Sequence, residues 1–286
     1  MGDHICWTVS NEAVRLESLI DVVRAGLRAG HRVLYCGDDS DRARAALRGR
    51  GLHADAAVAS GDLRFAPAEP SFLTAGVFDP ATALRFLRRE IEDARHAGNP
   101  GLRLITDMSW ASRPAPGVER LPEFEAEANT IFAEGYLLGV CAYDPRLFDP
   151  LSLRGVSRAH PGTVGADAPF DPDLVLRIRH TRQPFGLRLE GEADLLNQRA
   201  LSAVLDHLLD ALTDGSATAT VDVSGLRFVD TAAARVLLRA LDQAAGRLRI
   251  TGRPPALARL LASRHAGQSP ARHDRVPRSG LGGTSA

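Results

Sequence analysis

The stretch VDVSGLRFVDTAAARVLL, residues 221–238, decides the fold of the second half of this chain. Its apolar first part is typical of a buried strand, a tight loop follows, and Asp230 and Thr231 open a helix. Either residue can cap that helix by accepting hydrogen bonds from the unpaired N–H groups of its first turn. A hydroxyl at a helix N-terminus is also a suitable phosphate site, because the helix dipole stabilises a dianion there. The two interpretations are compatible.

Around this stretch the sequence predicts a compact α/β unit of about ninety residues, which is long enough for a core of its own. The expected strands are residues 175–180, 185–189, 218–223 and 248–251, and the expected helices are residues 197–212, 231–245 and 255–263. The segment TRQP, residues 181–184, is typical of a hairpin turn between the first two strands.

Residues 173–264 resemble, in this order of segments, the STAS domain of anti-sigma-factor antagonists. The segment LEGEADL, residues 189–195, is similar to the Gly-Glu-Leu-Asp stretch of that family. Residues 248–252 and 255–261 are similar to its closing strand and helix. The family signature after the central strand is Asp-Ser-Ser-Gly, and its first serine accepts phosphate. Here Asp230 is followed by Thr231 in the place of that serine, with Ala232 and Ala233 after it.

The resemblance implies that Thr231 is the candidate phosphoacceptor and that a partner-binding or switch surface includes Asp194, Asp230, Thr231 and Ala232. The implied partner is an anti-sigma factor or a related serine/threonine-kinase-like protein. Because Thr231, Ala232 and Ala233 depart from the signature, a constitutive scaffold that is not phosphorylated remains an alternative.

The first half of the chain alternates strand and helix patterns. The expected strands are residues 4–9, 32–36, 63–65, 102–106 and 137–143, and the expected helices are residues 12–29, 41–50, 79–97 and 121–133. Strands separated by helices predict an α/β fold with a mainly parallel sheet that is covered by helices on both faces.

Ligands of parallel sheets bind at the carboxyl ends of the strands, and several polar or aromatic residues follow the predicted strands. The candidate pocket residues are Trp7, Asp38, Asp107, Ser109, Trp110 and Tyr143. Helix or loop capping by the two aspartates, and core packing of the tryptophans, are the competing interpretations. Residues 8–11, TVSN, stand where a phosphate loop is expected but contain neither glycine nor lysine, which argues against nucleotide hydrolysis.

Residues 1–163 resemble the MEDS sensory domain. The likeness rests on the segments HICW (4–7), GHRVLYCGDD (30–39), TDMSW (106–110) and VCAYD (140–144). The family is similar to a degenerate form of the RecA/KaiC-type nucleotide-binding sheets. The resemblance implies that this domain senses a small ligand, whose identity stays unknown.

The composition limits the functional classes. The 286 residues include 35 basic and 35 acidic side chains, so no overall charge favours nucleic acid or membrane. All basic residues are arginine, which excludes a Schiff-base lysine and a Walker A lysine. No Ser-His-Asp order stands out, so we expect no catalytic residues, no enzyme activity and no cofactor.

The cysteines and histidines show no metal-ligand spacing, so the sequence predicts no metal site. The three cysteines, Cys6, Cys36 and Cys141, fall on three strands of one predicted sheet, where two can be neighbours. Buried cysteine is usually a small apolar residue, with thiol or metal sensing assisted by His4 as a minor alternative. We expect four other histidines to be exposed: His53, His96, His160 and His207.

The sequence predicts a cytoplasmic regulator with two domains. Residues 1–163 form the sensory domain, 164–172 a linker, 173–266 the STAS-like domain and 267–286 a disordered tail. No secretory leader is evident, and no apolar run reaches the roughly 18 residues of a spanning helix. A nucleotide-dependent enzyme with a regulatory STAS domain is the less favoured alternative.

Overall fold

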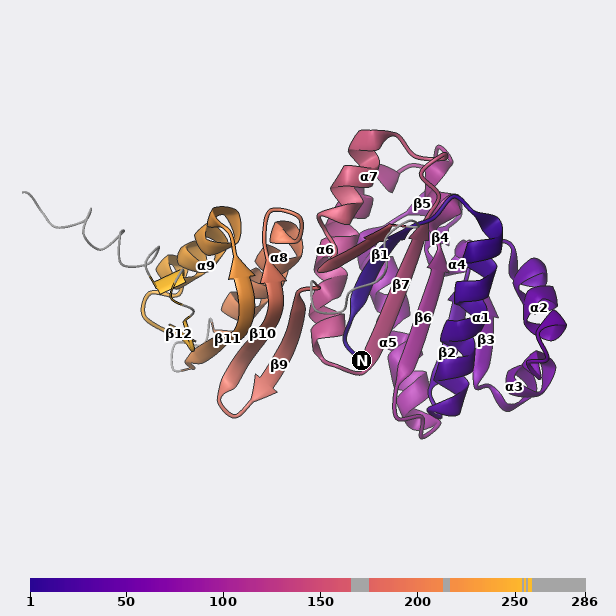
Figure 1. Ribbon diagram of the computed structural model, residues 1–286, viewed down its shortest axis with the longest axis horizontal. Helices are drawn as coiled ribbons and strands as arrows, with labels where there is room; N and C mark the ends of the chain where they lie inside the picture. Colours follow the sequence, from indigo (N-terminus) through magenta and orange to yellow (C-terminus); the bar gives the residue numbers. More distant parts are fainter. Residues whose placement is uncertain (166–174, 213–216, 254, 256, 259–286) are drawn as a thin grey trace, which may run out of the picture.

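The computed structural model describes residues 1–165, 175–212, 217–253, 255 and 257–258. They form two α/β units, each with its own sheet, which lie side by side in Figure 1. The predicted tail 267–286 and most of the predicted helix 255–263 lie outside the described residues.

The sheet of the N-terminal unit has six parallel strands, as the alternating pattern predicts. Their order across the sheet is β3 (Leu63–Ala66), β2 (Arg32–Cys36), β6 (Leu102–Asp107), β7 (Leu137–Tyr143), β1 (His4–Thr8) and β8 (Gly162–Gly165). The predicted linker begins too early, because Val164 and Gly165 belong to β8 and pair with Trp7 and Thr8.

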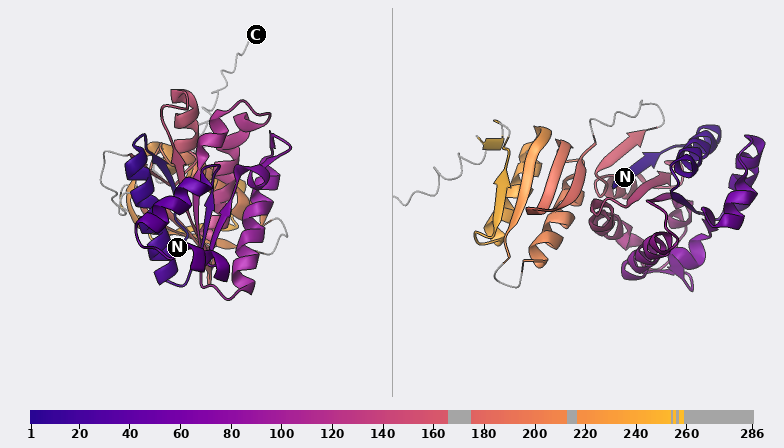
Figure 2. Two further views of the ribbon diagram at one scale, coloured as in Figure 1. Left: turned by 90° about the vertical axis from the view of Figure 1, so that its right-hand side faces the viewer. Right: turned by 90° about the horizontal axis from the view of Figure 1, so that it is seen from below.

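Helices cover both faces of this sheet (Figure 2, right). One face carries α1 (Glu12–Arg28), α2 (Ser40–Gly49) and α3 (Ala54–Ser60), and the other carries α5 (Pro80–His96) and α6 (Leu121–Ala133). The remaining elements are α4 (Ala68–Ser71), the hairpin β4 (Leu73–Thr74) and β5 (Val77–Phe78), the 3-10 helices η1 (Met108–Ser112) and η2 (Val118–Arg120), and α7 (Pro150–Ser157).

The start of each long helix follows from its capping residue. The Asn11 side chain accepts hydrogen bonds from the backbone N–H groups of Ala13 (3.0 Å) and Val14 (3.3 Å), and so begins α1. The carboxylate of Asp79 accepts from the Thr82 N–H at 2.9 Å, with Pro80 at the first position of α5. Both starts agree with the sequence prediction.

The side chains of β1 and β7 alternate between the two faces, because successive residues of a strand point in opposite directions. Cys6 lies beside Cys141 in the register and faces the core that includes α6. Trp7 and Ala142, the next residues along these strands, are also paired but line the other face. The prediction that two cysteines are neighbours is therefore confirmed for Cys6 and Cys141.

The C-terminal unit has a four-stranded mixed sheet. Its order is β12 (Leu248–Thr251), β11 (Ala219–Val229), β10 (Phe185–Ala193) and β9 (Arg177–Arg182), and its helices are α8 (Gln198–Asp210) and α9 (Thr231–Gln243). β9 and β10 form the predicted hairpin, whereas β10, β11 and β12 run parallel.

Strand β11 is longer than the sequence predicts, since residues 224–229 continue the strand and do not form a tight loop. The register against β10 shifts near Gly225, which pairs with Glu190. A Cβ at Gly225 would lie 2.7 Å from Glu190 Cγ and 3.0 Å from the Leu189 carbonyl oxygen. Glycine therefore permits the close approach that continues the pairing up to Val229 and delivers Asp230 to the start of α9.

Helix α6 connects the two units by packing against α8 and β9 of the C-terminal unit. Ala133, near the end of α6, is buried within the C-terminal core. The Asp3 carboxylate adds to this contact by pairing with the guanidinium groups of Arg177 (3.2 Å) and Arg179 (3.1 Å).

The first testable consequence concerns the core of the N-terminal sheet. Leu34→Ala removes a fully buried side chain from β2 and should lower the free energy of unfolding by about 2–5 kcal/mol. Leu151→Ala, at a side chain 76% exposed, should change it by less than about 0.5 kcal/mol. Urea unfolding followed by tryptophan fluorescence compares the two variants, and equal losses would contradict this core.

Candidate functional site

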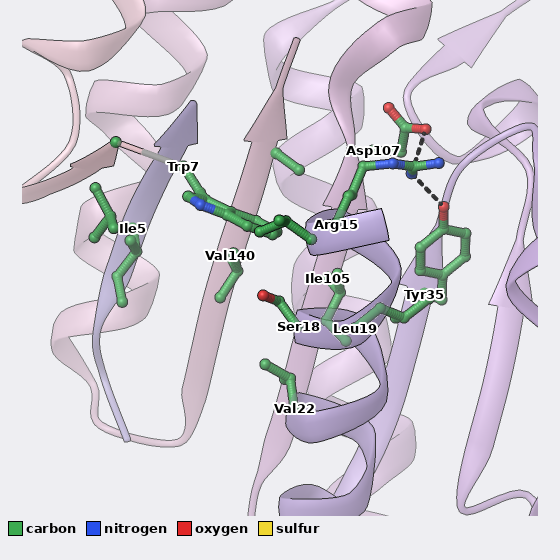
Figure 3. Close-up of a pocket in the computed structure, with 14 residues that line it drawn as sticks. Ile5, Trp7, Arg15, Ser18, Leu19, Val22, Tyr35, Ile105, Asp107 and Val140 are labelled. Carbon is green, nitrogen blue, oxygen red and sulfur yellow. Dashed lines mark hydrogen bonds and ion pairs between the residues drawn. The ribbon is translucent and has the colours of Figure 1, made fainter. Parts of the chain in front are cut away.

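A groove of about 360 Å³ lies on the α1 face of the N-terminal sheet (Figure 3). Helix α1 packs over β2 and β6, and the groove extends from α1 across β7, β1 and β8. Its lining is mostly apolar: Ile5, Trp7, Val14, Leu19, Val22, Ile105, Val140, Ala142, Val164 and Gly165. Its polar lining is Arg15, Ser18, Tyr35 and Asp107.

Arg15 organises the polar end of the groove. Its guanidinium donates to Asp107 at 3.0 Å, to Asp39 at 2.6 Å and to Glu12 at 2.8 Å. The Tyr35 hydroxyl also contacts Arg15, at 3.4 Å, and donates a short hydrogen bond to Asp39. Three carboxylates around one arginine fix that side chain at the end of the apolar surface.

Two of the six predicted pocket residues, Trp7 and Asp107, line this groove. Asp107 also accepts from the Ser109 N–H at 3.0 Å, so it caps η1 and faces the groove with its other oxygen. Ser109 lines a second cavity of about 190 Å³ at the carboxyl ends of the strands, which shares Arg15 and Asp107 with the groove.

Three predicted pocket residues lie elsewhere. Trp110 is buried between Phe72 and Phe78, with ring centroids at 5.5 and 5.4 Å, because η1 folds back onto the α5–α6 side. Tyr143 points to that same side, where its hydroxyl donates to the Glu125 carboxylate. Tyr143 therefore does not line the groove. Asp38 is exposed, pairs with Arg113 and accepts from the Ala68 N–H at 3.1 Å.

His160 also differs from expectation, because it is buried and not exposed. It follows α7 and precedes β8, so its backbone lies at the edge of the sheet and its ring lies against His4 with centroids 4.1 Å apart. Burial, together with the neighbouring His4, lowers the pKa of His160 to about 4.

At the start of α9 in the C-terminal unit, Asp230 is the capping residue and Thr231 is exposed. One oxygen of Asp230 accepts from the Ala233 N–H at 2.8 Å, and the other accepts from the Leu195 N–H at 3.0 Å. Asp194 accepts from the Leu196 N–H at 2.8 Å. Asp194, Asp230, Thr231 and Ala232 therefore gather at one end of this sheet.

Large apolar side chains surround this point. Leu195 is 45% exposed, Leu196 is 62% exposed and Phe228 is 49% exposed. Sequence reasoning missed all three, although each lies within three residues of Asp194 or Thr231. We call these three side chains, with Asp194, Asp230, Thr231 and Ala232, the α9 surface.

Comparison with known proteins matches both units. Residues 3–161 match the family model described as MEDS, the methanogen/methylotroph, DcmR sensory domain. The chain belongs to the MEDS family. Residues 176–266 match the model described as Mlab, STAS domain, so a STAS domain follows the MEDS domain. Both resemblances seen in the sequence, and the α/β fold class they imply, are confirmed.

One curated relative is the transcriptional repressor DcmR of Methylorubrum extorquens, which is 26% identical over 164 residues. The match covers 56% of this chain and 59% of the relative. A KaiC-like protein from Pyrococcus horikoshii aligns with a TM-score of 0.45 and 12% identity, over 66% of this chain and 80% of that one.

The segment after β1 of the MEDS domain leads into the N-terminus of α1, where a phosphate loop would hold a phosphate. Asn11 is the capping residue of this helix. Because its side chain accepts from the Ala13 and Val14 N–H groups, these donors are already used. No helix among the described residues combines the length and apolar character needed to span a membrane.

Arg15 is the residue of this candidate groove that sequence reasoning missed. A signal was present, since Arg15 precedes Leu19 by four residues and so continues the buried stripe of α1 toward its first turn. An arginine on an apolar stripe indicates buried acidic partners. Those partners come from α1, the β2–α2 connection and β6, which only the fold brings together.

The network also sets the ionisation of Asp39. Burial alone would raise the pKa of this carboxyl, but hydrogen bonds from Arg15 and Tyr35 outweigh burial and hold the pKa below its usual 3.8. Asp39 therefore stabilises the fold above its ordinary pKa, and this contribution is lost as the pH falls through the lowered value in the folded state.

Arg15→Gln should accordingly lower the free energy of unfolding at pH 7 by about 1.5–3 kcal/mol. The difference from the wild type should shrink below about pH 4, where the carboxylates become protonated. Urea titrations across this range measure it. Arg24→Gln, which breaks a surface pair with Asp21, is the control and should cost less than about 1 kcal/mol. A difference that persists unchanged at pH 3 would contradict the ionic origin.

Proposed function

We propose that this protein is a cytoplasmic signalling regulator and not an enzyme. In this proposal the MEDS domain binds a small ligand in the groove, and the STAS domain binds a protein partner through the α9 surface. The observation that carries the proposal is the groove itself, an apolar surface whose one polar end is held by the Arg15 network. The match to a transcriptional repressor supports an output in transcription regulation.

The lining of the groove supports a particular chemical class of ligand. Ten of the lining residues are apolar. Of the four polar lining residues, Tyr35 and Asp107 contact Arg15. A small neutral molecule with an apolar body and one hydroxyl or amide group would bury its body against Trp7 and Val140. Its polar group would meet the Ser18 hydroxyl or the Asp107 carboxylate. The five N–H groups of Arg15 are already used by neighbouring side chains.

The α9 surface supports partner binding for a different reason. Exposed apolar side chains beside a helix N-terminus favour a protein partner, because their burial contributes to association. The implied partner is an anti-sigma factor or a serine/threonine-kinase-like protein. Among the described residues the Thr231 hydroxyl has no hydrogen-bond partner, and its exposure leaves it accessible to a kinase.

Phosphorylation of Thr231 would act on the contacts of Asp230. The phosphate adds about −1.5 to −2 charges next to a carboxylate that bridges the Ala233 and Leu195 N–H groups. Repulsion would weaken the link from Asp230 to Leu195 and displace the exposed leucines from the α9 surface. The proposed result is loss of partner binding with the fold retained.

Two alternatives make other predictions. A constitutive scaffold would keep the α9 surface without phosphorylation, and the Thr-Ala-Ala sequence after Asp230 favours it. A nucleotide-dependent enzyme is less favoured, because Asn11 already caps the helix at which a nucleotide phosphate would bind.

Binding of a neutral apolar probe, N-phenyl-1-naphthylamine, tests the groove. Val140→Phe fills its floor and should weaken binding about tenfold or more, whereas Val77→Phe on the exposed hairpin should leave binding unchanged. Trp7 emission should respond to the probe, and Trp7→Phe should remove the response because Trp110 is in the dry core. Equal probe affinity in the wild type and Val140→Phe would place binding outside the groove.

Substitution of Thr231 tests the switch. Thr231→Glu should weaken binding of an anti-sigma kinase from the same organism about tenfold, while Thr231→Ala should preserve binding and abolish phosphorylation. Because Asp230 is the cap, Thr231→Ala should change the free energy of unfolding by less than about 0.5 kcal/mol. Ser224→Glu, at an exposed position of β11, is the charge control.

Calorimetry measures the affinities, and mass spectrometry of the protein from its native host identifies the phosphopeptide. Partner binding that Thr231→Glu leaves intact, together with an unmodified Thr231 peptide, would favour the scaffold. Loss of binding in Ser224→Glu as well would show a general charge effect and not a switch at Thr231.

A further inference from the structure

Four potential metal ligands meet in the interior of the MEDS domain, on the sheet face opposite the groove. They are His4 of β1, Glu125 of α6, Cys141 of β7 and His160 between α7 and β8. All four are buried, and one ligand atom from each lies within 4.8 Å of the others. We infer that they form a binding site for a divalent transition metal, for which Zn²⁺ fits the donor set.

The distances agree with a tetrahedral site. Glu125 Oε2 lies 3.3 Å from His4 Nε2 and 3.5 Å from His160 Nε2. Cys141 Sγ lies 3.5 Å from His4 Nε2 and 4.0 Å from Glu125 Oε2. Zinc bonds of about 2.0–2.3 Å at tetrahedral angles place neighbouring ligand atoms about 3.3–3.6 Å apart. Small shifts of these side chains therefore complete the coordination.

Hydrogen bonds on the far side of each ring fix which imidazole nitrogen faces the centre. The Asn129 amide group donates to the carbonyl oxygens of Glu125 (3.0 Å), Ala126 (2.9 Å) and Ala159 (2.8 Å). Its oxygen must then accept, so His4 Nδ1, at 2.9 Å, is the donor. In the neutral imidazole, His4 Nε2 consequently presents a lone pair to Glu125 and Cys141.

His160 repeats this arrangement. Its Nδ1 donates to the Val156 carbonyl oxygen at 2.8 Å, and its buried Nε2 has no hydrogen-bond partner among the described residues. Imidazoles whose Nδ1–H binds a carbonyl or amide oxygen while Nε2 points to a shared centre are typical of metal sites.

Charge balance favours a metal ion at this centre. With both imidazoles neutral, two lone pairs face the Glu125 carboxylate, an arrangement that is repulsive in a buried site. With both protonated, two cationic rings would lie beside one carboxylate with their centroids 4.1 Å apart. With only His4 protonated, its charge balances that of Glu125, but the buried His160 Nε2 still has no hydrogen-bond partner among the described residues. A divalent cation with the Cys141 thiolate and the Glu125 carboxylate gives a neutral site and uses every inward-facing lone pair.

Tyr143 supports the same assignment. Its hydroxyl donates to Glu125 Oε1, which leaves Oε2 as the oxygen that faces the two histidines and the cysteine. Because all four ligands come from the protein and are closed off from solvent, the site is of the structural type. It would tie α6 to β1, β7 and the segment before β8.

Metal uptake by the full-length chain, made without a histidine tag and stripped with chelator, tests the inference. Zn²⁺ is added, unbound ion is removed by desalting, and bound metal is measured by plasma mass spectrometry. The wild type should retain about one ion per chain, as one four-ligand site requires. Cys141→Ala and His160→Ala should retain less than about a tenth of that. Cys36→Ala removes a buried cysteine of the same sheet face outside the cluster and should match the wild type.

Cobalt substitution gives a second measurement, whose main result comes from the wild type. Co²⁺ bound here should show thiolate-to-cobalt charge-transfer absorption and tetrahedral ligand-field bands, and Cys36→Ala should keep both. Tyr143→Phe should weaken Co²⁺ affinity about 10–100-fold while retaining these bands, because the tyrosine only orients Glu125.

A wild-type protein that binds neither Zn²⁺ nor Co²⁺ would overturn the inference, whether or not the ligand variants fold. Equal retention by Cys141→Ala and Cys36→Ala would mean an adventitious ion only and would also overturn it. Circular dichroism checks the fold of each variant. Should Cys141→Ala fail to fold, absence of the thiolate-to-cobalt band in the folded wild type decides against the site.

Discussion

The organisation of the MEDS domain depends on one geometric constraint, the alternation of side chains along strands buried on both faces. In β1 and β7, even-numbered His4 and Cys6 pair with Gly139 and Cys141, and face α6. Ile5 and Trp7 pair with Val140 and Ala142, and face the groove. The same two strands thus line an apolar groove on one side and a buried polar cluster on the other. A shift of the register by a single residue would exchange the two sets and destroy both.

Helix α6 connects the sheet face that carries the buried polar cluster to the STAS domain. Glu125 and Asn129, one turn apart, point toward His4 and His160, while Ala133 enters the C-terminal core and the helix packs on α8. The side chain of Asp3, next to His4, adds ion pairs to Arg177 and Arg179 of β9. A change in the position of β1 relative to α6 would therefore act on both contacts between the domains. This shared helix supplies a physical basis for linking a bound ligand to the α9 surface.

Both proposed functional regions use a charged side chain that also has a structural task. Arg15 pairs with Glu12, Asp39 and Asp107 and in doing so closes the polar end of the apolar groove. Asp230 caps α9 and in doing so holds the Leu195 backbone of the α9 surface. A charge brought close to either residue changes local structure and binding together. Such coupling suits a regulator, because no separate moving part is required.

Local sequence determined much of this protein: the alternation of strands and helices, the parallel sheet, the caps Asn11 and Asp79, and the position of Thr231 after a buried strand. These features depend on residues a few positions apart, whose periodicity and capping chemistry are visible in the chain. The same kind of pattern placed Trp7 and Asp107 near the ends of their strands, and both line the groove. The tertiary structure alone decided that Trp110 and Tyr143 turn away from the groove and that Arg15 closes it. It also decided that His160 is buried beside His4, Glu125 and Cys141. These outcomes depend on which face a side chain takes and which distant segment meets it, and packing of the whole domain sets both.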